Sequence, residues 1–118
     1  IHISVTDVER SVAFYRDVLG IPHLFTVPGQ PMAFFDCGGV RLYLGIAEKP
    51  EFAHTSILYF RVGDIVAAHE AMAARGASFV HPPHKVHADA RHELWLAFFT
   101  DSERNNLALM SEVPLPAR

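Results

Sequence analysis

The chain has 118 residues, of which 50% are hydrophobic and 19% charged, with a formal net charge of −3. This composition is typical of a compact folded domain, and an acidic balance without a basic stripe argues against nucleic acid as a partner. No apolar run approaches the roughly 18 to 20 residues that cross a bilayer, which argues against a membrane protein. The N-terminus has no signal pattern, and the single Cys37 cannot form an internal disulfide, so we expect a cytoplasmic protein.

The first half of the chain alternates between strand-like and helix-like patterns. Residues 1–6 alternate between apolar and polar side chains, which predicts a strand. Asp7 is a suitable N-cap for a helix that ends at Gly20. Three apolar runs separated by turn residues follow, and we expect strands over 21–27, 32–37 and 40–46.

The second half repeats this order. The segment Val5-Thr6-Asp7-Val8 returns about 57 positions later as Val62-Gly63-Asp64-Ile65. We expect a strand over 57–62, a helix between Asp64 and Gly76, and further strands over 77–81, 92–100 and 106–111. The polar stretch 82–91 is interpreted as a loop, and the tail 113–118 is expected to lie outside the core.

The repeat predicts an α+β fold built from two tandem β-α-β-β-β modules, over 1–50 and 54–112, in one domain that covers 1–118. Neither module is long enough to bury a core alone, so we expect the two to pack together. A cleft between the modules is then the expected place of a ligand.

The sequence also resembles a known family. The segments VTDVERSVAFYRDVLGI, GGVRLYLG, FRVGDI and LAFFTDSERNNLALM are similar to motifs of the vicinal oxygen chelate superfamily, which includes glyoxalase I, bleomycin-resistance proteins and extradiol dioxygenases. The resemblance covers nearly the whole chain and implies the same two-module fold, in which the modules form a cupped mixed sheet around a hollow. It also implies a divalent metal in most enzymes of the family, held by His, Gln and Glu side chains that face the hollow.

The positions that match the family's metal ligands carry other residues here. They are Tyr43, Ile57 and Ala108, and a fourth would precede Ile1. Ile and Ala have no donor atoms, and Tyr is an uncommon ligand at neutral pH. We therefore expect no metal at these positions, and a divalent metal only through other ligands.

The side chains that alternation directs into the hollow predict the ligand. They are aromatic, cationic or hydroxyl-bearing, and with one residue of a later strand the predicted ligand-binding set is His2, Ser4, Arg41, Tyr43, Tyr59, Arg61 and Trp95. Such a lining suits a small aromatic or anionic organic molecule.

The histidines of the second module give a further hypothesis. His81, His84, His87 and His92 lie within twelve residues, and a metal would need three of them to converge. We also consider 82–91 as a lid, with His92, Glu93 and Trp95 at its base and His92 or Glu93 as a general acid or base.

Three function classes remain open at this point. The first is a small-molecule-binding protein that works without the family metal. The second is a metal-dependent lyase, isomerase or dioxygenase of the glyoxalase type. The third is a non-catalytic dimerisation or regulatory domain. The resemblance implies a homodimer in each case.

Overall fold

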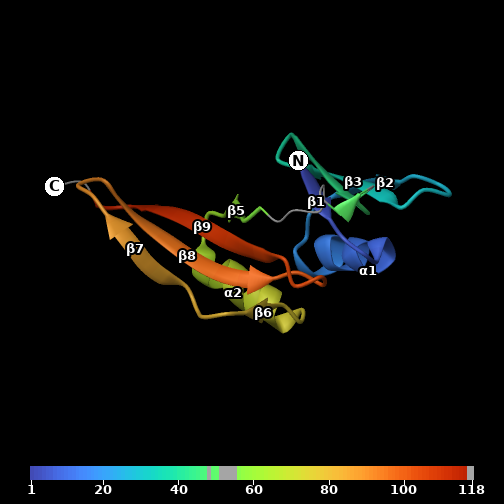
Figure 1. Ribbon diagram of the computed structural model, residues 1–118. Helices are drawn as coiled ribbons and strands as arrows, with labels where there is room; N and C mark the ends of the chain where they lie inside the picture. Colours follow the sequence, from blue (N-terminus) through green and yellow to red (C-terminus); the bar gives the residue numbers. More distant parts are fainter. Residues whose placement is uncertain (48, 51–55, 117–118) are drawn as a thin grey trace. The chain divides into compact units, whose positions relative to one another are not determined.

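The computed structural model describes residues 1–47, 49–50 and 56–116. It divides into two compact units, of which the first comprises Ile1–Ser56 with Asp101–Asn105 and the second Ile57–Thr100 with Asn106–Arg118. Each unit is a mixed β-sheet with a helix, which confirms the predicted α+β class (Figure 1). No helix in the described part of the chain has the length and apolarity that a membrane span requires.

The sheet of the first unit contains four strands in the order β1-β4-β3-β2. The strands are β1 (His2–Ser4), β2 (His23–Thr26), β3 (Met32–Cys37) and β4 (Val40–Gly45). β1 runs parallel to β4, and the other pairs are antiparallel. Gly38 and Gly39 both have positive φ, which allows the two-residue turn between β3 and β4.

One face of this sheet is covered by α1 (Val8–Ala13), which continues as the π-helix η1 (Phe14–Val18). Asp7 begins the helix as predicted, since its side chain accepts the backbone N–H of Arg10. The buried Tyr15 packs against Phe35 of β3, with 6.1 Å between the ring centres. The remaining side chains of each strand, which alternate with these, point to the opposite face, which α1 does not cover.

A hairpin that follows β8 in the chain belongs to the first unit. Asp101 accepts hydrogen bonds from the Tyr15 hydroxyl at 2.7 Å and from the backbone of Glu103 and Asn105. The Glu103 carboxylate accepts three more, from the backbone and hydroxyl of Thr6 and the backbone of Asp7. The hairpin thus satisfies polar groups where β1 leads into α1.

The second unit repeats this topology. Its sheet has the order β5-β9-β8-β6, with β7 also paired to β8 and β5 parallel to β9. The elements are β5 (Leu58–Arg61), α2 (Ile65–Ala74), β6 (Ser78–Phe79), β7 (His84–Ala88), β8 (His92–Thr100) and β9 (Asn106–Pro114). The equivalent strand orders confirm the internal repeat that the sequence predicted.

Two expectations for the second unit were wrong. The predicted loop 82–91 contains β7, which pairs antiparallel with β8 through an irregular step between Lys85 and His87. The hairpin turn between them is stabilised by Asp89, whose carboxylate accepts the backbone N–H groups of Arg91 and His92. β9 also extends to Pro114, because its last residues pair with the start of β8.

Candidate functional site

A row of four rings crosses the first unit's sheet on the face that α1 leaves open. The register aligns His2, Tyr43, Phe34 and Phe25, one from each strand. Neighbouring ring centres are 4.6, 5.0 and 5.0 Å apart, and Phe34 and Tyr43 stack with their planes only 13° apart. We call these four residues the aromatic row.

The aromatic row is accessible to a ligand. Phe25 is 45% exposed, and His2, Phe34 and Tyr43 are half-buried. The flanking residues on the same strands, Ile3 and Leu44, are buried on the other face. The row is therefore an accessible aromatic surface rather than part of the core.

A cation lies beside the row. The Arg41 guanidinium carbon is 6.0 Å from the centre of the Phe34 ring, at the outer limit of cation–π contacts. The Arg41 side chain belongs to an exposed residue and is available to an anionic group.

A buried hydroxyl lies on the same face. Ser4 pairs with Gly45 in the register, one step along from the His2–Tyr43 pair. Its Oγ is buried and has no hydrogen-bond partner among the described residues. An unsatisfied buried hydroxyl is uncommon in folded proteins, which makes Ser4 a candidate to bind a polar ligand atom.

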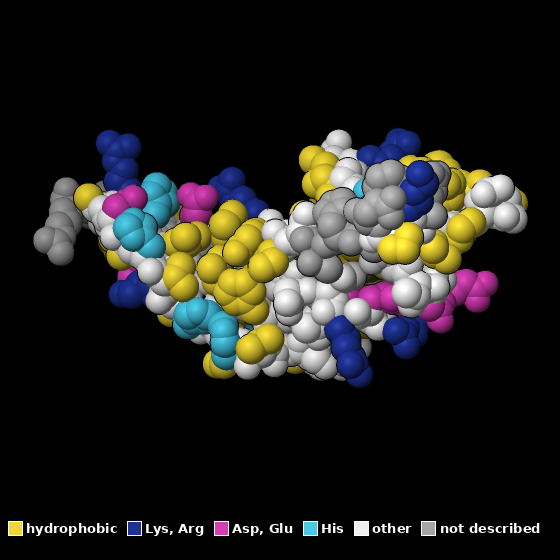
Figure 2. Space-filling model, viewed as in Figure 1, with side chains coloured by type: hydrophobic (Ala, Val, Ile, Leu, Met, Phe, Trp, Pro, Cys, Tyr) yellow, Lys and Arg dark blue, Asp and Glu magenta, His cyan; other side chains and the backbone are white. Residues whose placement is uncertain are grey.

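The second unit has its own open sheet face. Tyr59 and Phe98 meet edge to face with 6.0 Å between ring centres, and His81 contacts Phe98 at 5.8 Å. Arg61 shares this face, because it pairs with Met110, which pairs in turn with Leu96. Figure 2 shows hydrophobic side chains gathered on this unit, with histidines at the margins of the patch.

Trp95 and Glu93 lie on the other face of that sheet. Trp95 pairs with Ser111 and Lys85. It lies one residue from Leu96 and three from Phe98 along β8, and an odd separation puts side chains on opposite faces of a strand. Its Nε1 donates to Glu93 at 3.3 Å, and Lys85 forms an ion pair with Glu93 at 3.4 Å. The structure therefore does not bring Trp95 together with Tyr59 and Arg61.

His92 is exposed at the first position of β8, where it pairs with Pro114. It is adjacent to Glu93 in sequence, but successive residues of a strand point to opposite faces. The two candidate acid–base residues are thus separated by the sheet. The proposed lid is also replaced by the ordered hairpin of β7 and β8.

The seven predicted ligand-binding residues fall into three places. His2, Ser4, Arg41 and Tyr43 share the open face of the first unit, Tyr59 and Arg61 the open face of the second, and Trp95 the covered face of the second. Phe25 and Phe34 were missed by the sequence reasoning. Extending the alternation rule to the second and third strands of the first module would have identified them.

A hollow of about 560 Å³ lies elsewhere in the first unit. It lies between the turn from β1 to α1 and the loop 26–31, and Asp7 and Glu9 contribute to its wall. None of the four aromatic-row residues lines it. Its acidic wall does not match the anionic ligand that Arg41 favours.

The residues at the family's metal positions do not fit a metal. Ala108 is fully buried and Ile57 is apolar, so neither has a donor atom. Tyr43 is engaged in ring contacts on both sides. Among residues 1–47, 49–50 and 56–116, no three or more His, Cys, Asp or Glu side chains form a group suited to holding a metal ion.

Comparisons with known proteins agree with this architecture. The fold of two β-α-β-β-β repeats defines a glyoxalase-like class. The family model of the Glyoxalase/Bleomycin resistance protein/Dioxygenase superfamily matches residues 1–109, and the chain belongs to this superfamily.

Among curated proteins, the chain is 36% identical over 56 residues to metallothiol transferase FosB of Staphylococcus epidermidis. That match spans 48% of this chain but only 37% of FosB.

Solved structures share the fold over almost the whole chain. TioX from Micromonospora sp. ML1 has a TM-score of 0.80 with 19% identity, over 96% of both chains. Lactoylglutathione lyase from Agrobacterium tumefaciens has a TM-score of 0.74 with 21% identity, over 94% of this chain and 90% of the other. TnmS3, an antibiotic binding protein from Streptomyces sp. CB03234, has a TM-score of 0.70 with 20% identity, over 95% and 92%.

Proposed function

We propose that this protein binds a planar aromatic molecule with an anionic group, and that it does so without the metal of its superfamily. The observation that carries the proposal is the aromatic row on the open face of the first unit. Binding and holding the ligand is then the activity, and no bond in the ligand needs to change.

The row supplies the apolar part of the binding energy. A planar ligand set against Phe34 and Tyr43 replaces water on half-buried rings, and contacts between aromatic rings, stacked or edge to face, add about 0.5–1.5 kcal/mol beyond the area buried. Stacking does not need a deep cavity, which agrees with a site formed on a sheet face.

Polar groups at the border of the row supply orientation. Arg41 pairs with a carboxylate, sulfonate or phosphate of the ligand, and the Ser4 hydroxyl takes a hydrogen-bonding atom. TnmS3 is described as an antibiotic binding protein, which supports a binding role for a protein of this fold.

The proposal is tested by a titration of ¹⁵N-labelled protein with 1-naphthoate, a planar aromatic anion, followed by two-dimensional NMR. We expect saturable shifts at His2, Phe34, Arg41 and Tyr43. Tyr43→Ala should weaken binding about tenfold or more, since it removes the central stacking partner. Arg41→Gln should weaken 1-naphthoate but not 1-naphthylmethanol, its uncharged analogue.

The matched control is the double variant Tyr59→Ala with Arg61→Ala on the second unit. It should leave binding to the aromatic row unchanged. If this double variant lost binding while Tyr43→Ala still bound 1-naphthoate as the unchanged protein does, the site would lie on the second unit and the proposal would be contradicted.

We also propose that the chain forms a homodimer. Large apolar side chains are exposed on the second unit, among them Tyr59 at 47% and Val80 at 64%. Exposed apolar surface favours association between copies. Light scattering coupled to gel filtration should give about twice the chain mass, and a monomeric mass across the accessible concentrations would contradict the dimer.

A further inference from the structure

Two histidine rings of the second unit lie together on its open face. The ring centres of His81 and His84 are 4.4 Å apart and their planes differ by 78°. His84 Nδ1 lies 3.2 Å from the backbone oxygen of Pro82. A carbonyl oxygen only accepts, so Nδ1 carries the proton in this bond and Nε2 keeps the lone pair that binds metals.

The spacing of the rings allows both to bind one ion. With metal–nitrogen bonds of about 2.1 Å, each ring centre lies about 3.2 Å from the ion, so ligands at a right angle have centres about 4.5 Å apart and tetrahedral ligands about 5.2 Å. The observed 4.4 Å is within a few tenths of an ångström of the right-angle value. Right angles between nitrogen ligands are typical of Cu²⁺ and Ni²⁺.

The surroundings hold one ring in place and leave the pair accessible. His81 packs edge to face on Phe98 at 5.8 Å, and this contact restricts the ring. His81 is exposed and His84 is half-buried, so an ion can reach both. The convergence of three histidines expected from the sequence does not occur, since no third His, Cys, Asp or Glu side chain joins the pair within the described residues. The site therefore has two protein ligands, and water would complete the coordination.

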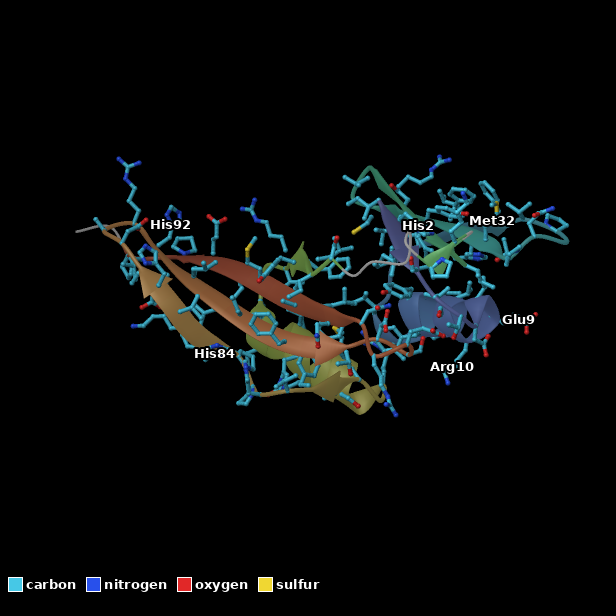
Figure 3. The ribbon with its side chains drawn as sticks, viewed as in Figure 1. His2, Glu9, Arg10, Met32, His84 and His92 are labelled. Atoms are coloured by element: carbon cyan, nitrogen blue, oxygen red, sulfur yellow. The ribbon has the colours of Figure 1, made fainter. Side chains whose placement is uncertain are left out.

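The two remaining histidines of this region are separate from the pair. His84 is opposite Leu96 and His87 is opposite Leu94, beyond the irregular step in β7. His92 lies four residues from Leu96 along β8, or about 13 Å at about 3.3 Å per residue. Figure 3 shows His84 and His92 at different ends of the hairpin.

We infer that His81 and His84 together bind one divalent copper or nickel ion. This site uses none of the superfamily's ligand positions, which are Tyr43, Ile57 and Ala108 here. It is also independent of ligand binding at the aromatic row, because it needs neither Tyr43 nor Arg41.

The test is calorimetric titration of the untagged full chain with CuCl₂ and with NiCl₂ near neutral pH. We expect one ion per chain, and a loss of affinity of at least about tenfold for His81→Ala and for His84→Ala. The matched control is the double variant His87→Ala with His92→Ala, which removes two exposed histidines of the same hairpin and should bind as the unchanged protein does.

Electron paramagnetic resonance of the Cu²⁺ complex supplies a second readout. The unchanged protein should show two equatorial nitrogen ligands, and each single variant of the pair should show one fewer. Circular dichroism checks that both variants stay folded. Equal affinity in the pair variants, a loss in the control variant, or no binding to the unchanged protein would each overturn the inference.

Discussion

Tyr43 owes its place in the aromatic row to the residue two positions later. A Cβ built on Gly45 would lie 2.8 Å from Cζ and the hydroxyl oxygen of Tyr43, closer than real Cβ contacts. The ring therefore lies along the strand over Gly45. Any side chain at position 45 would displace the ring.

Gly45→Ala is expected to displace the Tyr43 ring while the sheet stays intact. A flexible side chain can give way, so the free energy of unfolding should change by less than about 1 kcal/mol. Binding of 1-naphthoate should weaken several-fold, because the stacked pair is disturbed. Gly63→Ala is the matched control, since its Cβ would meet nothing within 4 Å. Equal affinity in both variants would show that the row does not bind the probe.

The Glu103 carboxylate accepts three hydrogen bonds from the turn between β1 and α1. Its side chain is only 8% exposed and accepts from Thr6 and Asp7. Burial alone would raise its pKa, but these hydrogen bonds and the charge of Arg10 together hold the pKa below its usual value. The folded state thus favours the ionised form.

The lowered pKa makes this contact sensitive to acid. Its contribution to stability is complete above the ordinary Glu pKa of about 4.3 and is lost as the pH falls through the lower folded pKa. Glu103→Gln should cost about 1–2 kcal/mol at pH 7, and the deficit should shrink toward pH 3. Urea unfolding at several pH values measures it. The exposed Glu9→Gln is the control, and a deficit independent of pH would contradict this account.

At the scale of elements, β8 is the centre of the second unit. It pairs with β9 along nine residues on one side and with β6 and β7 on the other. β6 has two residues and β7 contains an irregular step, so both are weak edges.

Amide hydrogen exchange should be slower in the inner strands of this sheet than in its edge strands. We expect amides in the middle of β8 and β9 to exchange at least about tenfold more slowly than those of β6 and β7, since inner strands open only with the whole sheet. Mass spectrometry of short peptides resolves the difference. Uniform exchange across the four strands would show that the unit opens as a single element.

The helices and most strands could be predicted from local signals. Asp7 and Asp64 cap their helices as expected, because a capping carboxylate acts within one turn of the chain. β7 could not be predicted, since His84–Ala88 has no clean alternation and becomes a strand only through its pairing with β8. The π-helical end of the first helix carries no local signal that we recognise.

The candidate site was predicted only where alternation extends along one strand. His2, Ser4 and Tyr43 were assigned to one face, which the register confirms. Trp95 was grouped with Tyr59 and Arg61. Whether they share a face depends on how β5 pairs with β9 and β9 with β8, and this pairing cannot be predicted from the sequence of one strand.

At the scale of the whole molecule, the repeats and the units do not coincide. The chain passes between the units after Ser56, after Thr100 and after Asn105. The hairpin 101–105 lies in the second sequence repeat, yet it satisfies Tyr15, Thr6 and Asp7 of the first. The buried Tyr15 hydroxyl of the first repeat therefore depends on Asp101 of the second repeat as its hydrogen-bond acceptor.

A fragment of residues 1–56 should consequently fail to fold alone. It would leave the Tyr15 hydroxyl buried without its acceptor and expose the start of α1. Circular dichroism should show little structure for this fragment, and adding a fragment of residues 57–118 should restore it. A stably folded fragment 1–56 would contradict the role given to the hairpin.

The placement of this hairpin bears on how such a protein can arise by gene duplication. A single ancestral module would have lacked the hairpin of a second copy, unless another molecule of the same module supplied it. Fusion of two copies places donor and acceptor in one polypeptide. The two halves can then differ, as His2 and Tyr59, or Tyr43 and Ala108, do at equivalent positions.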